Sequence, residues 1–88
     1  MKRNDDYIIR TIAGETLLVP TGKAAQEFSG LVTLNELGAF IWEHMNEAAD
    51  TEALCQMILE EYDGDPQEVR KDTEEFLELL SSHHMAAL

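Results

Sequence analysis

The chain has 88 residues, is 44% hydrophobic, and carries a formal net charge of −12 from 18 acidic and 6 basic residues. This length supports one domain and excludes two independent cores, and the hydrophobic content excludes a disordered acidic tail. So acidic a chain would repel the phosphates of nucleic acids and of anionic membranes, which disfavours both as partners.

The number of cysteines and the lengths of the apolar runs indicate the cellular compartment of the protein. Cys55 is the only cysteine in the sequence, which excludes an internal disulfide framework and a cysteine-rich zinc site. Residues 1–10 lack the apolar stretch of a signal peptide, and no apolar run approaches the roughly 20 residues that a membrane span needs. We therefore expect a cytoplasmic protein with no membrane partner.

The N-terminal part of the chain is predicted to form a meander of three strands. Tyr7–Ile12 contains β-branched and aromatic residues, Glu15–Val19 contains a Leu-Leu-Val run, and the Ala13-Gly14 pair between them suits a tight turn. Lys23–Glu27 is expected to be a connector with room for one helical turn. The third strand is expected at Phe28–Leu34, where apolar and β-branched residues surround a glycine.

Three helices are predicted to follow the strands, at about 35–46, 51–62 and 66–82. Asn35 is suited to cap the first helix, and Asp50 or Thr51 introduces the second. The third has the clearest start, because Asp65 is a good N-cap and Pro66 suits the first helical position. The predicted fold is therefore α+β: an N-terminal three-stranded antiparallel β-meander packed on a three-helix, winged-helix-like unit.

The side chains that carry most catalytic and metal chemistry are poorly placed for it. Cys55 lies beside the apolar stripe of the second helix with no histidine nearby, which favours a buried apolar role over a nucleophile. His83 and His84 are adjacent, so on a helix they diverge instead of meeting at one metal ion, and a frayed polar tail is the simpler interpretation. We expect no catalytic residue, no metal site and no cofactor.

The third predicted strand runs into the first helix with almost no loop. If this strand lies at an edge of the sheet, its unpaired N–H and C=O groups can accept a peptide as an additional strand. Gly30, inside the strand, indicates either a bulge or a place where another chain comes close. The pattern favours a peptide-binding module over an enzyme.

Several short runs along the chain are similar to one known family. They are Val19-Pro20-Thr21-Gly22, Phe28-Ser29-Gly30, Leu34-Asn35-Glu36 leading to Ile41-Trp42, Glu60-Glu61-Tyr62-Asp63, and Val69, Asp72, Phe76-Leu77 and Leu80. In this order and at these spacings, the chain resembles the PqqD family over nearly its whole length. Members are small peptide chaperones, also called RiPP recognition elements, from pathways that modify ribosomal peptides. The ending SSHHMAAL departs from the family's usual glycine followed by small apolar residues.

The resemblance implies a non-catalytic protein that binds the leader segment of a precursor peptide as an additional strand. It would then present the peptide to a modifying enzyme, commonly a radical SAM protein. Carried over to this sequence, the family's binding strand consists of Ser29, Gly30, Leu31, Val32 and Thr33. The helical side of the site would consist of Val69, Arg70, Thr73 and Leu77.

The predicted core stripe of the third helix has two flanks. Arg70 and Leu77 lie on one side of it, and Asp72 and Leu79 lie on the other. A cation at Arg70 suits an acidic leader, which favours the first flank. An i, i+4 ion pair between Arg70 and Glu74 explains the arginine equally well.

Two other functions stay open. A winged-helix transcription regulator would use the third helix for recognition, although acidic residues crowd that helix. A structural dimerisation module would pair the same strand edge with a second copy, giving a homodimer. The sequence identifies neither the precursor peptide nor the partner enzyme.

Overall fold

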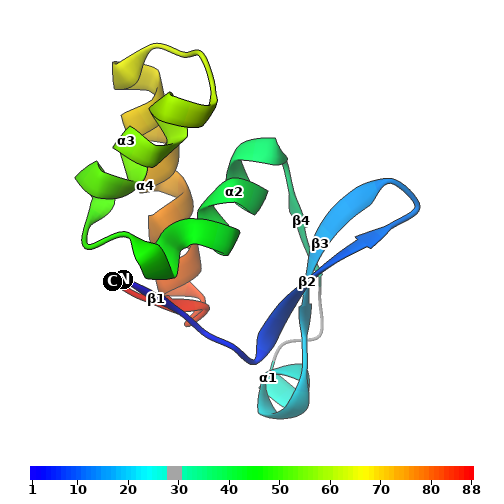
Figure 1. Ribbon diagram of the computed structural model, residues 1–88. Helices are drawn as coiled ribbons and strands as arrows, with labels where there is room; N and C mark the ends of the chain where they lie inside the picture. Colours follow the sequence, from blue (N-terminus) through cyan, green and yellow to red (C-terminus); the bar gives the residue numbers. More distant parts are fainter. Residues whose placement is uncertain (28–30) are drawn as a thin grey trace.

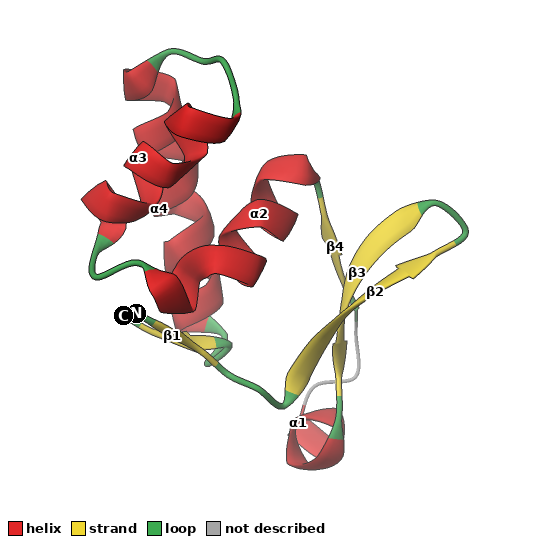
Figure 2. Ribbon diagram, in the orientation of Figure 1, coloured by secondary structure: helices red, strands yellow, loops and turns green. Residues whose placement is uncertain are grey.

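The computed structural model describes residues 1–27 and 31–88. The α+β prediction is confirmed: a three-stranded antiparallel sheet in the order β2-β3-β4 lies beside a group of helices (Figures 1 and 2). The strands are β1 (Lys2–Arg3), β2 (Tyr7–Ile12), β3 (Glu15–Pro20), β4 (Val32–Leu34) and β5 (Ala86–Ala87). The helices are α1 (Gly22–Glu27), α2 (Glu36–His44), the 3₁₀ helix η1 (Met45–Glu47), α3 (Thr51–Glu61) and α4 (Pro66–Ser82).

Several elements differ from the sequence-based bounds. The first predicted helix is divided into α2 and the short η1, and the predicted connector contains a full helix, α1. The third predicted strand is a strand only over Val32–Leu34, and Leu31 precedes it without regular structure. Residues 28–30, which that prediction also included, lie outside the described residues.

The β2–β3 hairpin is closed by the predicted two-residue turn. Ala13 and Gly14 both have positive φ, at 53° and 83°, as a type I′ turn requires. Glycine adopts this conformation freely, whereas alanine adopts it only under strain. The turn matches the right-handed twist of the two strands and pairs Ile12 with Glu15.

The sheet has one face toward the helices and one away from them. Ile9, Leu18 and Val32 lie opposite one another in the three strands and contact the core. Because side chains alternate along a strand, Leu17 and Thr33 form the corresponding pair on the other face. β4 therefore directs Val32 and Leu34 inward and Thr33 outward.

The helices α2, α3 and α4 each begin at a side-chain cap. Asn35 Oδ1 accepts a hydrogen bond from the Gly38 N–H at 2.8 Å, and Asp50 Oδ1 accepts one from the Ala53 N–H at 2.8 Å. Each bond satisfies one of the N–H groups that a helix leaves unpaired at its start. Asn35 confirms its predicted role and fixes the point at which β4 becomes α2.

The core lies between the helices and the inner face of the sheet. Leu18 and Leu34 reach it from the sheet, with 1% and 5% of their surface exposed. The helices supply fully buried apolar side chains, among them Ile41, Met45, Leu54, Ile58, Leu77 and Leu80. Each such side chain stabilises the fold by about 1.5–3 kcal/mol relative to exposure.

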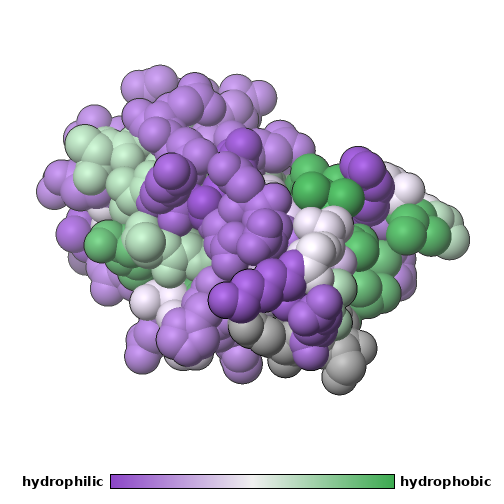
Figure 3. Space-filling model, turned by 90° about the horizontal axis from the view of Figure 1, so that it is seen from below, coloured by the Kyte–Doolittle hydropathy of each residue, from purple (hydrophilic) through white to green (hydrophobic). Residues whose placement is uncertain are grey.

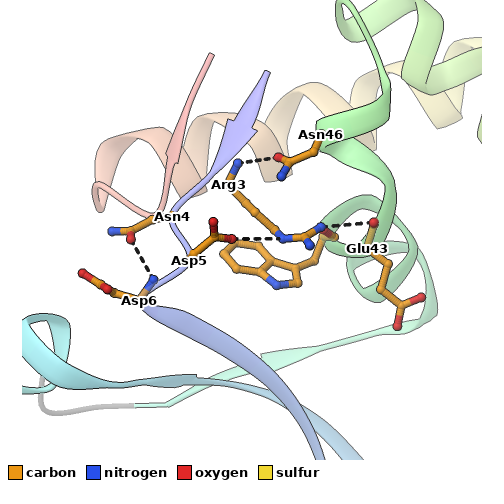
Figure 4. Close-up of polar contacts among 7 residues, drawn as sticks. Arg3, Asn4, Asp5, Asp6, Glu43 and Asn46 are labelled. Atoms are coloured by element: carbon orange, nitrogen blue, oxygen red, sulfur yellow. Dashed lines mark hydrogen bonds and ion pairs between the residues drawn. The ribbon is translucent and has the colours of Figure 1, made fainter.

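The two ends of the chain lie side by side and pair with each other. Lys2 faces Ala87 and Arg3 faces Ala86 in the small β1–β5 sheet. Arg3 Nη1 donates to the carbonyl oxygens of Trp42 and Glu43, at 2.8 and 3.1 Å, in the last turn of α2 (Figure 4). Carbonyl groups in the last turn of a helix are the ones that need partners from outside it, and the arginine also opposes the negative end of the helix dipole.

The predicted frayed tail is wrong. The Met85 N–H donates to the Leu80 carbonyl at 2.8 Å and the His84 N–H donates to the Ser81 carbonyl at 3.1 Å, which together form a Schellman ending of α4. His84 occupies the left-handed position of this motif, with φ 59°. Met85 follows it into the core with 1% of its surface exposed. We call β1, β5, Arg3 and Met85 the terminal clasp.

The outward face of the sheet keeps an apolar surface. Hydrophobic residues gather on the side of the molecule where the hairpin lies (Figure 3). On the hairpin itself, Ile12 has 55% of its surface exposed, and Ile8 and Val19, which face each other across the two strands, are half-buried. Among the described residues, no helix is long and apolar enough to cross a membrane.

Candidate functional site

The site begins at the edge of the sheet formed by β4. Among the described residues, β4 pairs with β3 alone, so one side of this strand has no neighbouring strand. The C-terminal tail pairs with β1 and not with β4. An edge strand carries main-chain donors and acceptors that another chain can pair with.

A groove lies next to the point where β4 ends. It has a volume of about 450 Å³ and is lined by the start of α2 and one side of α4, through Asn35, Leu37, Gly38, Asp72, Glu75, Phe76 and Leu79. We call it the α2–α4 groove. Leu37 and Phe76 are half-buried and pack on the core, whereas Leu79 has 42% of its surface exposed. The floor is therefore apolar, and two carboxylates lie on the rim.

Gly38 lies in the lining of this groove, close to the strand and to α4. A Cβ at this position would lie 3.4 Å from Leu34 Cδ2 and 3.4 Å from Phe76 Cε1, and 3.3 Å from the capping oxygen of Asn35. The first contact is with the last residue of β4 and the second with α4. Strand, α2 and α4 therefore meet at this glycine, which joins the strand edge and the groove in one place.

A second hollow shares part of this lining. It has a volume of about 300 Å³ and includes Asn35 and Leu37 together with Glu36, Tyr62, Asp63 and Val69. The pKa of the Tyr62 hydroxyl is raised above its ordinary value, first by desolvation and then by the negative charge of Glu36, which also accepts a hydrogen bond from it. Phe40 meets the Tyr62 ring edge to face, with centroids 5.6 Å apart.

The structure divides the helical half of the predicted site. Val69 is half-buried and lines the second hollow, and Arg70 is exposed. Arg70 Nε lies 3.0 Å from Glu74 Oε1, so the intrahelical pair weighed against a ligand role does form. Thr73 and Leu77 are core residues, with 0% and 2% of their surface exposed. Neither presents a surface to an incoming chain in this structure, so a direct peptide contact at these two residues stays a prediction.

The strand half is placed more simply. Leu31 is exposed, with 57% of its surface accessible, and Thr33 is exposed on the outward face. Val32 points inward and is half-buried. Ser29 and Gly30 lie outside the described residues.

Two of the residues that line the groove from α4, Asp72 and Leu79, belong to the flank that the charge of Arg70 disfavours. The other two are Glu75 and Phe76, of which Phe76 is a predicted core residue. Leu79, a large apolar residue beside the predicted core stripe and next to the buried Leu80, is exposed and lines the groove. Its place beside the stripe is the sequence feature that could have pointed to this flank.

Chemistry-bearing residues do not gather at this site. Within residues 1–27 and 31–88, no three His, Cys, Asp or Glu side chains are grouped so as to hold a metal ion. Cys55 is buried. His44 Nδ1 lies 3.0 Å from Glu47 Oε2 at an exposed position beyond the groove lining.

The sequence matches a family model described as coenzyme PQQ synthesis protein D (PqqD), over residues 8–86. The chain belongs to the PqqD family. The match runs from β2 to β5 and so includes β4, α2 and α4, the three elements that form the site. A search of curated proteins gave no match.

One solved structure shares the fold. It is TbiB1 in complex with the TbiA(beta) leader peptide, with a TM-score of 0.72 and 24% sequence identity, and the match covers 98% of this chain and 94% of that one. The likeness spans both the sheet and the helices, which supports the same α+β arrangement in this PqqD-family chain.

Proposed function

We propose that this protein is a peptide-binding RiPP recognition element. It binds the leader segment of a ribosomally made precursor peptide as an additional strand at β4 and presents that peptide to a modifying enzyme. The observation that carries the proposal is the open edge of β4 next to the α2–α4 groove. Family membership supports it, and so does the leader peptide named in the complex of similar fold.

The two parts of the site have different tasks. Main-chain hydrogen bonds to β4 give affinity that tolerates many sequences, and a groove that accepts alternate side chains gives selectivity. Because β4 directs Val32 and Leu34 inward, an added strand continues the alternation and directs every second side chain toward the helices. Leu37, Phe76 and Leu79 would receive these side chains.

The contact residues follow from this arrangement. Of the residues expected from the sequence, Leu31, Val32 and Thr33 remain strand candidates, together with Ser29 and Gly30. Val69 and Arg70 remain helix candidates at the second hollow. Thr73 and Leu77 would act from the core, by fixing the position of α4.

The protein would take part in the pathway without catalysing a step. Bond-making would belong to the partner enzyme, for which we propose a radical SAM protein, as the family resemblance implies. The module would need no cofactor of its own. Its task would be to hold the leader so that the rest of the precursor reaches the enzyme.

Calorimetric titration of the full chain tests the proposal. The titrant is the leader segment of a precursor peptide encoded beside this gene, and the expected dissociation constant is micromolar or tighter. The control is the same leader with prolines at alternate positions, which removes main-chain donors. Strand addition predicts that the control peptide fails to bind. Equal binding of both peptides, or of neither, contradicts the proposal.

Two alternatives make different predictions. α4 carries Asp72, Glu74, Glu75 and Glu78, so its charge opposes a role in DNA recognition, and we expect no gel shift at low salt. The open β4 edge also suits a homodimer formed by pairing two copies. Such a dimer would compete with the leader, so added leader should lower the molecular mass measured by light scattering.

A further inference from the structure

The charge around the site is of one sign. Asp72 and Glu75 line the α2–α4 groove, and Glu36 and Asp63 line the hollow that shares Asn35 and Leu37 with it. No lysine or arginine lines either hollow. Two apolar hollows that meet at Leu37 are therefore bordered by four carboxylates.

The groove carboxylates have no cationic partner of their own. Asp72 and Glu75 are exposed and make no ion pair within 4.0 Å with any described residue. Arg70, one of the cations on α4, pairs with Glu74 instead. The rim therefore holds unneutralised charge next to an apolar floor made by Leu37, Phe76 and Leu79.

The net charge of the chain also favours a cationic ligand. At −12, the protein attracts cationic peptides and repels anionic ones before any contact is made. An anionic side chain placed in the groove would lie beside Asp72 and Glu75. The repulsion between these like charges would oppose binding. A cationic side chain would gain charge-assisted hydrogen bonds there.

We propose that the peptide received at β4 is basic where it crosses the groove. An apolar side chain enters between Leu37, Phe76 and Leu79, and a neighbouring lysine or arginine pairs with Asp72 and Glu75. This inference rests on the proposed function and adds the chemical class of the ligand. It reverses the expectation of an acidic leader, which depended on Arg70.

Two synthetic peptides test it. They share length and an alternating apolar pattern, and differ in carrying lysine or glutamate at the remaining positions. Each is titrated into the full chain with the Val32–Leu34 amide shifts and the dissociation constant as readouts. We expect the lysine peptide to bind about tenfold or more tightly at low salt, with the difference shrinking at high salt.

Neutralising variants locate the effect. Asp72→Asn with Glu75→Gln should weaken the lysine peptide about tenfold, because each loses a charge-assisted contact while keeping its shape. Glu52→Gln with Glu60→Gln, exposed on α3, is the matched control, since it changes net charge equally outside the groove lining. We expect the control to change the affinity by less than about twofold.

The outcomes distinguish a failure of the basic-ligand inference from a failure of the proposed function. If the glutamate peptide shifts the β4 amides with equal or higher affinity, the proposed function stands and the basic ligand is wrong. If both variant pairs weaken binding equally, net charge and not the groove selects the peptide, which also overturns the inference. If neither peptide shifts the β4 amides, the inference and the proposed function fall together.

Discussion

The terminal clasp and the β4 edge both consist of short strands with main-chain hydrogen-bonding groups. In the clasp these groups are paired with the protein's own chain, whereas β4 has a partner strand on one side alone among the described residues. In the clasp, β1 pairs with β5, and Arg3 satisfies carbonyls at the end of α2. In the separate three-stranded sheet, β4 has a partner strand on one side among the described residues, and no described cation pairs with Asp72 or Glu75 in the groove beside it. The first region is closed by the protein's own chain, and the second is the one that we propose receives another chain.

The difference separates stability from binding. Contacts in the clasp and directly beside it join residues far apart in sequence, such as Asn4 Nδ2 donating to the His84 carbonyl at 3.2 Å. At the groove, Asp72, Glu75 and Leu79 remain exposed, so these three side chains add little to the stability of the folded state alone. Substitutions in the clasp should therefore change the free energy of unfolding, and substitutions in the groove should change peptide affinity.

The largest expected effect is in the clasp. Met85→Ala should lower the free energy of unfolding by about 2–4 kcal/mol, because a fully buried side chain is replaced by a cavity. Urea denaturation followed by circular dichroism measures it. Leu88→Ala, with 62% of the leucine exposed, is the control and should change stability by less than about 0.5 kcal/mol. If Met85→Ala lowered the free energy of unfolding no more than Leu88→Ala does, the clasp would not be part of the core.

The next effect is in the groove. Leu79→Ala should weaken leader binding about tenfold, or roughly 1.4 kcal/mol, because it removes an apolar contact that the free protein leaves exposed. The free energy of unfolding should change by less than about 0.5 kcal/mol. Ile12→Ala, exposed on the hairpin, is the matched control and should leave affinity unchanged. The reverse pattern would place the peptide on the outward face of the sheet.

The clasp can also be strengthened. His84→Gly should raise the free energy of unfolding by about 1 kcal/mol, because glycine adopts the left-handed conformation at φ 59° without a Cβ penalty. His83→Gly, at φ −101°, should give no such gain. Thermal unfolding of the two variants measures the contrast, and an equal effect would rule out backbone strain at His84.

The smallest expected effect tests a core residue that the sequence assigned to the site. Thr73 Oγ1 is fully buried and has no hydrogen-bond partner among the described residues. Thr73→Val keeps the shape and removes the unpaired hydroxyl, so stability should stay level or rise by up to about 1 kcal/mol. Leader affinity should not change. A drop in leader affinity with an unchanged free energy of unfolding would show that Thr73 contacts the peptide.

Much of the fold follows from local signals in the sequence. The Ala13-Gly14 turn, the Asn35 cap and the Asp65-Pro66 start of α4 each depend on a few neighbouring residues, and each has the expected form. The terminal clasp could not be predicted in this way. Its strands are two residues long, too short for a pattern, and their pairing depends on where α4 ends.

The site was predictable in part. The strand that borders the groove follows from the sequence because β4 runs directly into α2, but the flank of α4 that lines the groove does not. Leu77 and Leu79 are both apolar residues close to the predicted stripe, and the rotation of α4 against its neighbours decides that one is buried and the other exposed. Such a rotation depends on tertiary packing, which helical periodicity alone does not fix.

The most direct test of the open strand is amide hydrogen exchange, read by NMR with and without the leader peptide. The proposed function predicts that bound leader slows exchange at amides of Val32–Leu34, while Arg3 and Ala86 in the clasp keep their rates. Unchanged exchange at β4 under saturating leader, with protection appearing elsewhere, would contradict strand addition at this edge.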